Sequence, residues 1–158
     1  MAKYAPPAKT EVLWVVTVSD YTAITASEVN AGTDLSTFVR NMPDLPRTAN
    51  LVDVSTIDSK FEKRQVGTRG GDVASLEILR DDSTDTAYTT LTEDSSGFLV
   101  LGRKGWTTAG TVTTGDEVDV FPVTIASKAD GTPGRNEPDF AVVEMAITDD
   151  PNRGYTIA

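Results

Sequence analysis

Short segments in which apolar and polar residues alternate recur along most of this chain, and they restrict its fold more than any other feature. Alternation with a period of two places one row of side chains on each face of a β-strand, and these segments are rich in the β-branched residues that strands favour. The expected strands are residues 11–18, 51–61, 71–80, 98–101, 117–126 and 140–147.

Helical patterns are much weaker. Residues 81–94, DDSTDTAYTTLTED, predict the one substantial helix, because acids fill its first turn and three apolar residues follow at helical spacing. Shorter helical turns are expected between residues 24 and 40, the first of them capped by Thr25 or Ser27. The predicted fold is therefore mainly β: a β-sandwich or barrel with a flanking α-helix.

The chain is long enough for one compact domain, residues 1–158. Its 158 residues include 39% hydrophobic residues, which suffices for a single buried core. No apolar run approaches the roughly 20 residues of a membrane span, and no secretory signal is visible at the start. We expect no membrane binding.

Cysteine and histidine are both missing from the composition. Their absence removes disulfides, thiolate nucleophiles, cysteine zinc sites and the usual general base near neutral pH. The acids Asp81, Asp82 and Asp85 do not follow a calcium-loop pattern and are better explained as helix-terminal acids. We expect no enzyme activity, no cofactor and no metal; only carboxylate chemistry such as glycoside hydrolysis stays open.

The charge of the chain is strongly acidic, with a formal net charge of -10. Such a surface repels nucleic-acid phosphates, so tight DNA or RNA binding is not expected. Several acids occupy strand positions whose neighbours are apolar, which predicts a wet acidic face opposite a buried one. These acids are Asp53, Glu77, Glu117, Asp119 and Glu144.

One basic, glycine-rich segment, KFEKRQVGTRGG at residues 60–71, interrupts this acidic chain. Its glycines match no phosphate-binding loop, and no helix start follows them. We predict a loop between two paired strands, either a solvated hairpin tip or a long arm, in which glycine permits bends.

Several stretches resemble the major tail tube protein of long-tailed (siphovirus-type) bacteriophages, particularly those of actinobacterial hosts. They are ITASEVNAGTDLS, DVSTIDSKFEKRQVGTRGGD, SGFLVLGR and the terminal DVFPVTIASKADGTPGRNEPDFAVVEMAITDDPNRGYTIA. The resemblance spans nearly the whole chain and carries no catalytic signature. It implies a structural protein of the virion tail, assembled in the host cytoplasm.

The resemblance also implies partners and roles. Subunits of this family form hexameric rings that stack into a tube, and the partners are other copies, the tape measure protein, the tail terminator and tail-tip or distal tail proteins. The five acids would line the channel, through which DNA passes without specific binding. An arm at about residues 58–72 would reach a neighbouring copy through Lys60, Lys63, Arg64, Gly67, Arg69, Gly70 and Gly71.

Three further expectations remain. The polar ends, residues 1–9 and 149–158, are predicted to be flexible tails that order only between subunits. No immunoglobulin-like domain is expected after the tube domain. The main alternative function is a monomeric or small-oligomer decoration or adhesin module of a virion, which would not polymerise.

Overall fold

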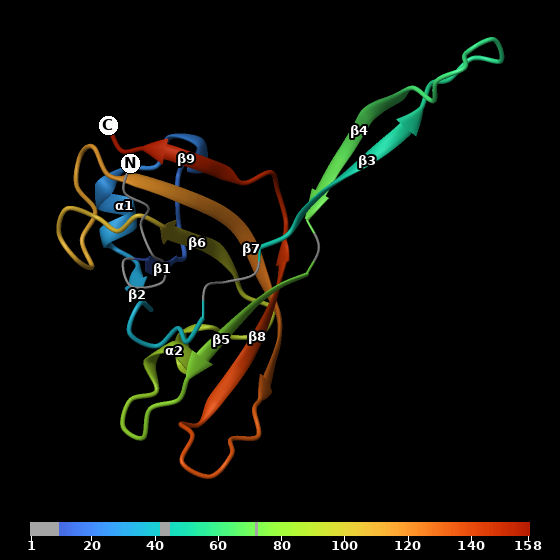
Figure 1. The fold of residues 1–158 in the computed structure, drawn as a ribbon. Coiled ribbons are helices and arrows are strands. Elements are labelled where there is room, and N and C mark those ends of the chain that lie inside the picture. Colours follow the sequence, from blue (N-terminus) through green and yellow to red (C-terminus); the bar gives the residue numbers. More distant parts are fainter. Residues whose placement is uncertain (1–9, 42–44, 72) are drawn as a thin grey trace, which may run out of the picture.

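The computed structural model describes residues 10–41, 45–71 and 73–158, and its main feature is one curved antiparallel sheet of seven strands (Figure 1). The strand order is β2-β1-β6-β7-β8-β5, and β9 pairs with β7 beside this path. The strands are β1 (Glu11–Val15), β2 (Thr33–Asp34), β5 (Val73–Leu79), β6 (Ser96–Gly102), β7 (Glu117–Asp130), β8 (Phe140–Ile147) and β9 (Asn152–Thr156). The prediction of a mainly β chain is confirmed.

The long strand β7 organises this sheet. Along one edge it pairs with β6, from Leu101↔Asp119 to Ser96↔Thr124. Its other edge is shared, because β9 pairs near Glu117 and β8 pairs from Val123 onward. A β-bulge between Ile125 and Ser127 shifts the register with β8. Such a bulge bends the strand and strengthens the local twist, in keeping with the curvature of the sheet.

Two apolar clusters cover opposite faces of the sheet, and β1 contributes to both. Val12 and Trp14 belong to the larger cluster, which contains residues of β5 and β8 and of the loop at Leu35. Leu13 and Val15 belong to the smaller cluster around Val29 and Ile157. The unbroken apolar run of β1 follows from this burial on both faces, which removes the need for alternation.

The sheet is not closed into a barrel by its strands, but one segment connects its two edges. Thr33–Asp34 pairs with β1, and a few residues later Val39 bridges Ile78 of β5. The Leu79 amide donates to the Phe38 carbonyl at 2.7 Å, and the Arg40 amide donates to the Glu77 carbonyl at 3.0 Å. The segment of residues 33–40 thus covers the edge of β1 and the edge of β5.

The helices are shorter than predicted. α1 is Ala26–Asn30, capped by Thr25 as expected, and α2 is only Thr86–Thr90. The prediction of one substantial helix over residues 81–94 is wrong, because Asp85 adopts a left-handed conformation with φ 47° and its side chain pairs with Arg80 instead of capping. Threonine-rich sequence sustains little helix unless packing holds it. A one-turn 3₁₀ helix, η1, spans Tyr21–Ala23.

A separate two-stranded hairpin, which we call the arm, is formed by β3 (Arg47–Asp53) and β4 (Arg64–Gly71). The predicted pairing was wrong here. Residues 51–61 were expected to pair with 71–80 across a basic loop, but Asp53 pairs with Arg64 and Arg47 pairs with Gly71. Most of the basic segment is therefore strand, and β5 pairs with β8 instead.

The C-terminal residues form part of the domain. β9 pairs with β7, and Ile157 is 1% exposed inside the smaller apolar cluster. The prediction of a flexible tail over residues 149–158 is wrong for this segment, because a few well-placed residues anchor an otherwise polar sequence. The predicted N-terminal tail, residues 1–9, lies outside the described residues.

Candidate assembly surfaces

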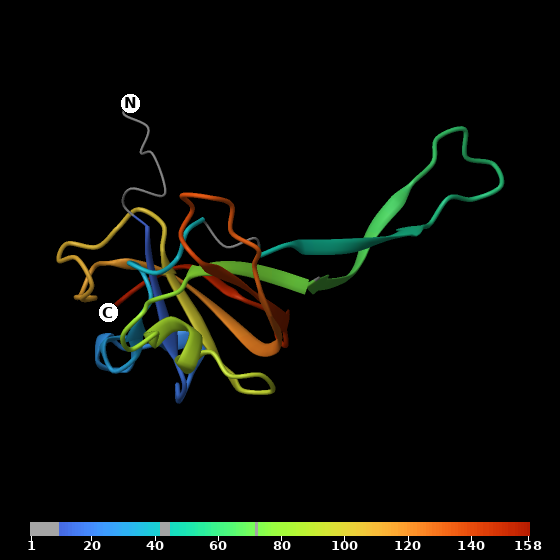
Figure 2. The same cartoon turned by 90° about the horizontal axis from the view of Figure 1, so that it is seen from below.

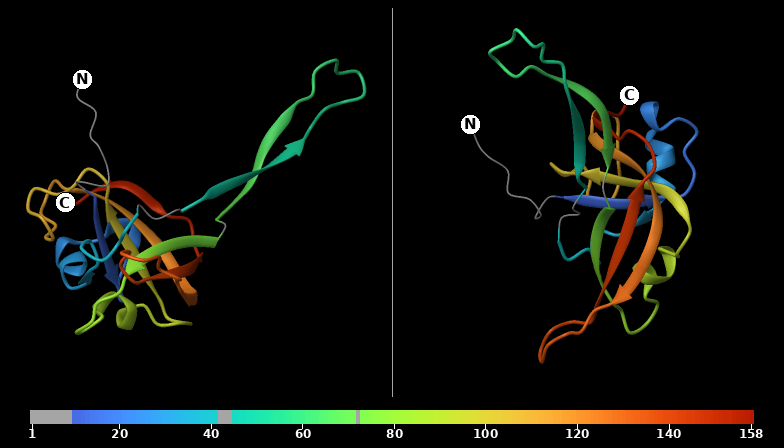
Figure 3. Two further views of the ribbon diagram at one scale, coloured as in Figure 1. Left: turned by 60° about the horizontal axis from the view of Figure 1, so that its bottom comes forward. Right: turned by 90° about the vertical axis from the view of Figure 1, so that its right-hand side faces the viewer.

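The arm leaves the body of the domain and extends well beyond it in every view (Figures 2 and 3). An isolated hairpin of two strands is marginally stable in water, since it has no face to bury. The strands of the arm pair only with each other among the described strands. Over most of its length the arm therefore pairs with no other described strand of its own chain.

Apolar side chains are concentrated on this unsupported arm. Of the large hydrophobic residues that are exposed, six lie between β3 and β4 or within them: Leu51, Val52, Val54, Ile57, Phe61 and Val66. Phe61 is 76% exposed and Ile57 is fully exposed at the tip. Leu51 and Val66 are directly paired across the hairpin. Exposed apolar surface on this scale is typical of a protein–protein contact.

The tip of the arm has a defined turn despite its exposure. Asp53 Oδ1 accepts from the Ser55 amide at 2.9 Å. This hydrogen bond, followed by one from the Ser55 side chain, holds the pKa of Asp53 below its usual range. The Lys63 amide donates to Ser55 Oγ at 2.8 Å, and the Val54 amide donates to the Lys63 carbonyl. The apolar tip side chains are thus presented on an ordered loop.

The predicted arm residues divide between the tip and the base. Lys60 and Lys63 are exposed at the tip, Arg64 lies 3.5 Å from Glu62, and Arg69 lies near the base of the arm. The three glycines do not provide bends, because none of them has a positive φ and all lie in β4. Gly71 instead allows a close approach to Ile147: a Cβ at this position would come within 2.9 Å of the Ile147 Cβ. The glycines are Gly67, Gly70 and Gly71.

The five predicted acids do not share one sheet face, so that part of the prediction is wrong. Asp53 lies on the arm. Glu77 and Glu144 lie on the face of the sheet opposite the larger apolar cluster, since Leu76 and Val143 point into that cluster. We call the part of this face that the smaller apolar cluster leaves uncovered the outer face. Glu77 is paired with Arg40 at 3.0 Å, whereas Glu144 is exposed and lies opposite Ser75.

Glu117 and Asp119 lie on the other face of β7, the side to which Phe121 points. Asp119 is only 7% exposed. Its Oδ2 accepts from Arg103 Nε at 2.8 Å, and its Oδ1 accepts from the Gly154 amide at 2.6 Å. Asp119 therefore fastens β9 to the sheet. Glu117 pairs with Lys104 at 2.9 Å.

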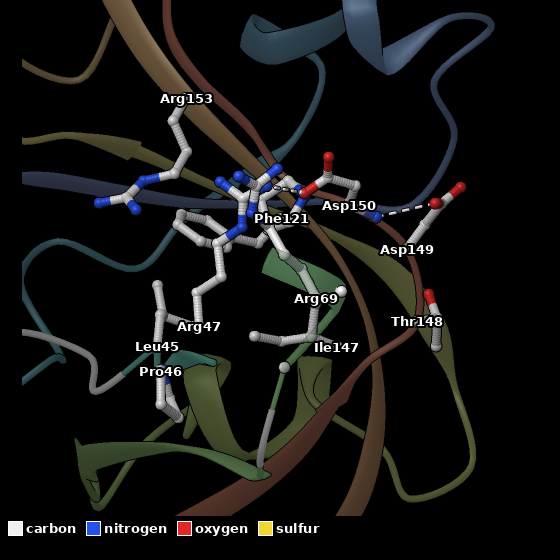
Figure 4. A pocket seen from close by; sticks show the side chains of 14 residues that line it. Leu45, Pro46, Arg47, Arg69, Phe121, Ile147, Thr148, Asp149, Asp150 and Arg153 are labelled. Atoms are coloured by element: carbon white, nitrogen blue, oxygen red, sulfur yellow. Dashed lines mark hydrogen bonds and ion pairs between the residues drawn. The ribbon is translucent and has the colours of Figure 1, made fainter. Parts of the chain in front are cut away.

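A pocket of about 470 Å³ opens where the arm joins the body (Figure 4). The apolar part of its lining is Leu45, Phe121 and Ile147, and its arginines are Arg47, Arg69 and Arg153. Arg47 pairs with Asp150 at 2.7 Å. Within the described residues, Arg69 and Arg153 make no ion pair, although Asp149 and Asp150 also line the pocket. We call this the basal pocket.

No cluster of three or more acidic side chains in the described ranges is arranged to hold a metal ion. Among the same residues, no helix has the length and apolar character needed to cross a bilayer. The described surface offers two features suited to protein contact: an apolar arm and a pocket with arginine side chains.

A curved sheet with a projecting apolar arm is typical of one class of protein, the structural subunits of larger assemblies. The comparison with protein families agrees, because the model of the phage tail tube protein family matches residues 2–158. This chain belongs to the phage tail tube protein family, and it is thus a component of the virion tail. No curated protein matches its sequence.

Solved structures share the fold at low sequence identity. A chain of the anti-feeding prophage baseplate, from a 6-fold symmetrised cryo-EM structure, has a TM-score of 0.61 and 11% identity, over 94% of this chain and 95% of that chain. A chain of the tail of an empty gene transfer agent particle has a TM-score of 0.57 and 12% identity, over 96% of this chain and 100% of that chain. A chain from the native gene transfer agent virion scores 0.55 at 13% identity.

Sequence reasoning missed two features of these surfaces. The alternating apolar residues after Leu51 predict a strand with one buried face, whereas both faces of β3 are exposed in the monomer. The basal pocket joins Arg47 of β3 and Arg69 of β4 to Arg153 of β9, a strand that is distant from both in sequence. No local pattern predicts that junction.

Proposed function

We propose that this subunit assembles into stacked six-membered rings, and that the rings form the tail tube through which DNA passes. The observation that carries the proposal is the arm, with Ile57 fully exposed and Phe61 76% exposed on a hairpin whose strands pair only with each other among the described strands. Burial of such side chains contributes about 1.5–3 kcal/mol each. The arm can gain that burial only on another molecule.

The proposed number of six subunits in each ring is based on proteins of similar fold. The gene transfer agent tail was refined helically with C6 symmetry, and the anti-feeding prophage baseplate has 6-fold symmetry. Contacts that are heterologous and repeat along an axis generate closed rings or filaments. An arm on one surface and its receiving surface elsewhere on the same subunit fit that requirement.

The outer face of the sheet is the proposed wall of the channel. Its exposed and half-buried positions carry mainly small or hydroxyl side chains beside the exposed Val73, and Glu144 is the acid there without an ion pair among the described residues. Like charge keeps a polyanion from adhering, and small side chains leave little to obstruct it. The small side chains are Ser75, Ser96, Thr124, Ala126 and Ala146.

In this proposal the charges on the arm determine how it is aligned on a neighbouring subunit, and they contribute less to the affinity of that contact. Lys60, Lys63 and Arg64 are exposed, and exposed ion pairs contribute only about 0–1 kcal/mol each. The apolar residues supply the affinity, and the basic residues direct the arm toward an acidic neighbour. The tape measure, terminator and tail-tip proteins are the further partners that a tube of this kind requires.

Negative-stain electron microscopy of the purified protein over a concentration series tests the proposal. We expect rings and hollow tubes of uniform width, with a sixfold end-on view. Particles that stay monomeric or form only a small closed oligomer, including after addition of the tail-tip complex, would instead indicate a decoration or adhesin module.

A further inference from the structure

The basal pocket and the acidic end of the domain lie at opposite ends of the β7–β8 hairpin. Ile147, at the end of β8, lines the pocket, whereas the loop of residues 131–139 connects the other ends of the two strands. Figure 1 and the right-hand view of Figure 3 both place this loop at the far end of the body from the arm. The two sites therefore cannot meet within one chain.

The far end carries an excess of acids. Six acids lie in the 131–139 loop or beside Arg80, which contacts it, and four bases lie nearby. The acids are Asp81, Asp82, Asp85, Asp130, Glu137 and Asp139, and the bases are Arg40, Arg80, Lys128 and Arg135. Arg80 holds this end together, because it pairs with Asp85 at 2.6 Å and Asp130 at 3.0 Å, and its amide donates to the Asp139 carbonyl. Arg80 is thereby occupied, and within the loop itself Arg135 is the one base beside the two acids Glu137 and Asp139.

The loop presents its acids in a defined turn. Glu137 Oε2 accepts from the Gly134 amide at 2.9 Å, and the Glu137 amide donates to the Gly134 carbonyl. Asp139 Oδ1 accepts from the Phe140 amide. Both carboxylates are exposed and make no ion pair with a described residue, so each keeps acceptor capacity for a guanidinium group.

The basal pocket has the complementary chemistry. Arg69 and Arg153 have no acidic partner among the described residues, and Leu45, Phe121 and Ile147 provide an apolar surface that suits the ring of Pro133 or Pro138. Its volume of about 470 Å³ accommodates a few side chains. The arm tip is the other extended segment, but there Asp58 and Glu62 are offset by Lys60 and Lys63.

We propose that the 131–139 loop of one copy inserts into the basal pocket of the next copy along the tube, with Glu137 and Asp139 meeting Arg69 and Arg153. The proposal of this contact rests on the proposed function. It also defines the direction in which copies stack along the tube, because each copy presents its pocket to the loop of its neighbour. Because β4 lines the pocket, the loop contact is continuous with the contact made by the arm.

Charge reversal on each side tests the contact. We expect the pocket variant Arg69→Glu with Arg153→Glu, and the loop variant Glu137→Arg with Asp139→Arg, each to raise the critical concentration for tube formation about tenfold or more. All four substitutions in one chain restore tubes, as does an equimolar mixture of the two variants, in which copies alternate. Unchanged thermal unfolding of each monomer shows that the fold is intact.

Cross-linking provides a second readout, since the chain has no cysteine. With Arg153→Cys and Glu137→Cys in one chain, oxidation of assembled tubes should give a ladder of multimers on a non-reducing gel. A ladder from Arg153→Cys with Phe61→Cys but none from the first pair would place the arm tip in the pocket and overturn the inference. Tubes that form equally well with reversed charges also overturn it, whereas an unmodified protein that never forms tubes contradicts the proposed function itself.

Discussion

Gly71 packs directly against Ile147, so that a Cβ added to Gly71 would lie 2.9 Å from the Cβ of Ile147. This contact joins the end of the arm to the end of β8, beside the basal pocket. The atom in the way is a branched Cβ close to the backbone, which cannot swing aside. The position of the arm relative to the body thus depends on having glycine, which has no side chain, at position 71.

Substitution of Gly71 by alanine should displace the base of the arm. We expect a loss of about 1–3 kcal/mol in the free energy of unfolding, typical of overpacking, and a larger loss of tube formation. Gly70→Ala is the matched control, because nothing lies within 4 Å of a Cβ added there. Equal behaviour of the two variants in chemical denaturation and electron microscopy would contradict this role for Gly71.

Polar substitution at the arm tip should separate assembly from stability. Ile57→Asp and Phe61→Ser change side chains that are exposed in the monomer, so we expect its free energy of unfolding to change by no more than about 0.5 kcal/mol. Tube formation, measured by sedimentation, should fall sharply. The apolar replacements Ile57→Leu and Phe61→Leu should preserve it. A tip variant that assembles normally would show that these side chains do not carry the contact.

Reversal of the charge at Glu144 should affect DNA passage more than assembly. Glu144 is exposed on the outer face and its hydrogen bond to Ser127 Oγ is 3.3 Å long, so Glu144→Lys disturbs little within the subunit. A ring of lysines would attract DNA, and we expect slower ejection from tails of normal length. Glu144→Gln should have a smaller effect. Normal ejection kinetics for Glu144→Lys would remove this face from the proposed channel wall.

The pH dependence of stability should reveal the carboxylate of Glu28. Hydrogen bonds from the Ser19 and Thr25 amides, followed by the Ser19 hydroxyl, lower the pKa of Glu28 from 4.5 to about 2. A carboxyl with a lowered pKa stabilises the fold fully above its unfolded pKa and loses that contribution as the pH falls toward its folded pKa.

Thermal unfolding of Glu28→Gln measures this contribution. The wild-type protein should be the more stable at pH 7, and the difference in Tm should shrink between pH 4.5 and about 2. A difference that stays constant over this range would contradict the assigned hydrogen bonds.

Truncation of the core at the C-terminus should destabilise the monomer itself. Ile157 is 1% exposed within the smaller cluster, so Ile157→Ala should cost about 2–5 kcal/mol in the free energy of unfolding. Thr156→Ala, at an exposed neighbouring position, is the control. If Ile157→Ala proved as stable as the wild type, the C-terminal strand would not be part of the folded monomer.

The sequence predicted strands best where burial leaves a clear pattern. The ends of Phe140–Ile147 are predicted correctly, because a short apolar run stands between polar segments, and its alternate residues Ala141, Val143 and Met145 are buried in the larger cluster. β9 was missed, since its sequence NRGYT is polar and only Ile157 after it is buried. A strand held mainly by backbone pairing and by Asp119 leaves almost no trace in hydropathy.

The pairing of the arm and the grouping of the acids required long-range information. Residues 60–71 have the charges and glycines of a loop, yet most of them form β4. The pairing of β4 with β3 is made by backbone groups, which every residue type here provides, so composition does not reveal it. The acids of β7 and β8 were assigned to one face from alternation within each strand. Alternation does not say which face of one strand continues into the next, and the β7–β8 pairing settles it.

The burial of β1 on both faces affects how the subunit behaves before assembly. Val12 and Trp14 pack into the larger cluster, whereas Leu13 and Val15 pack into the smaller one. Loss of either cluster therefore destabilises β1, and with it the other cluster. The body should therefore unfold in a single cooperative step. A subunit waiting in solution would then rarely expose half-opened strand edges, which are the usual starting points of aggregation.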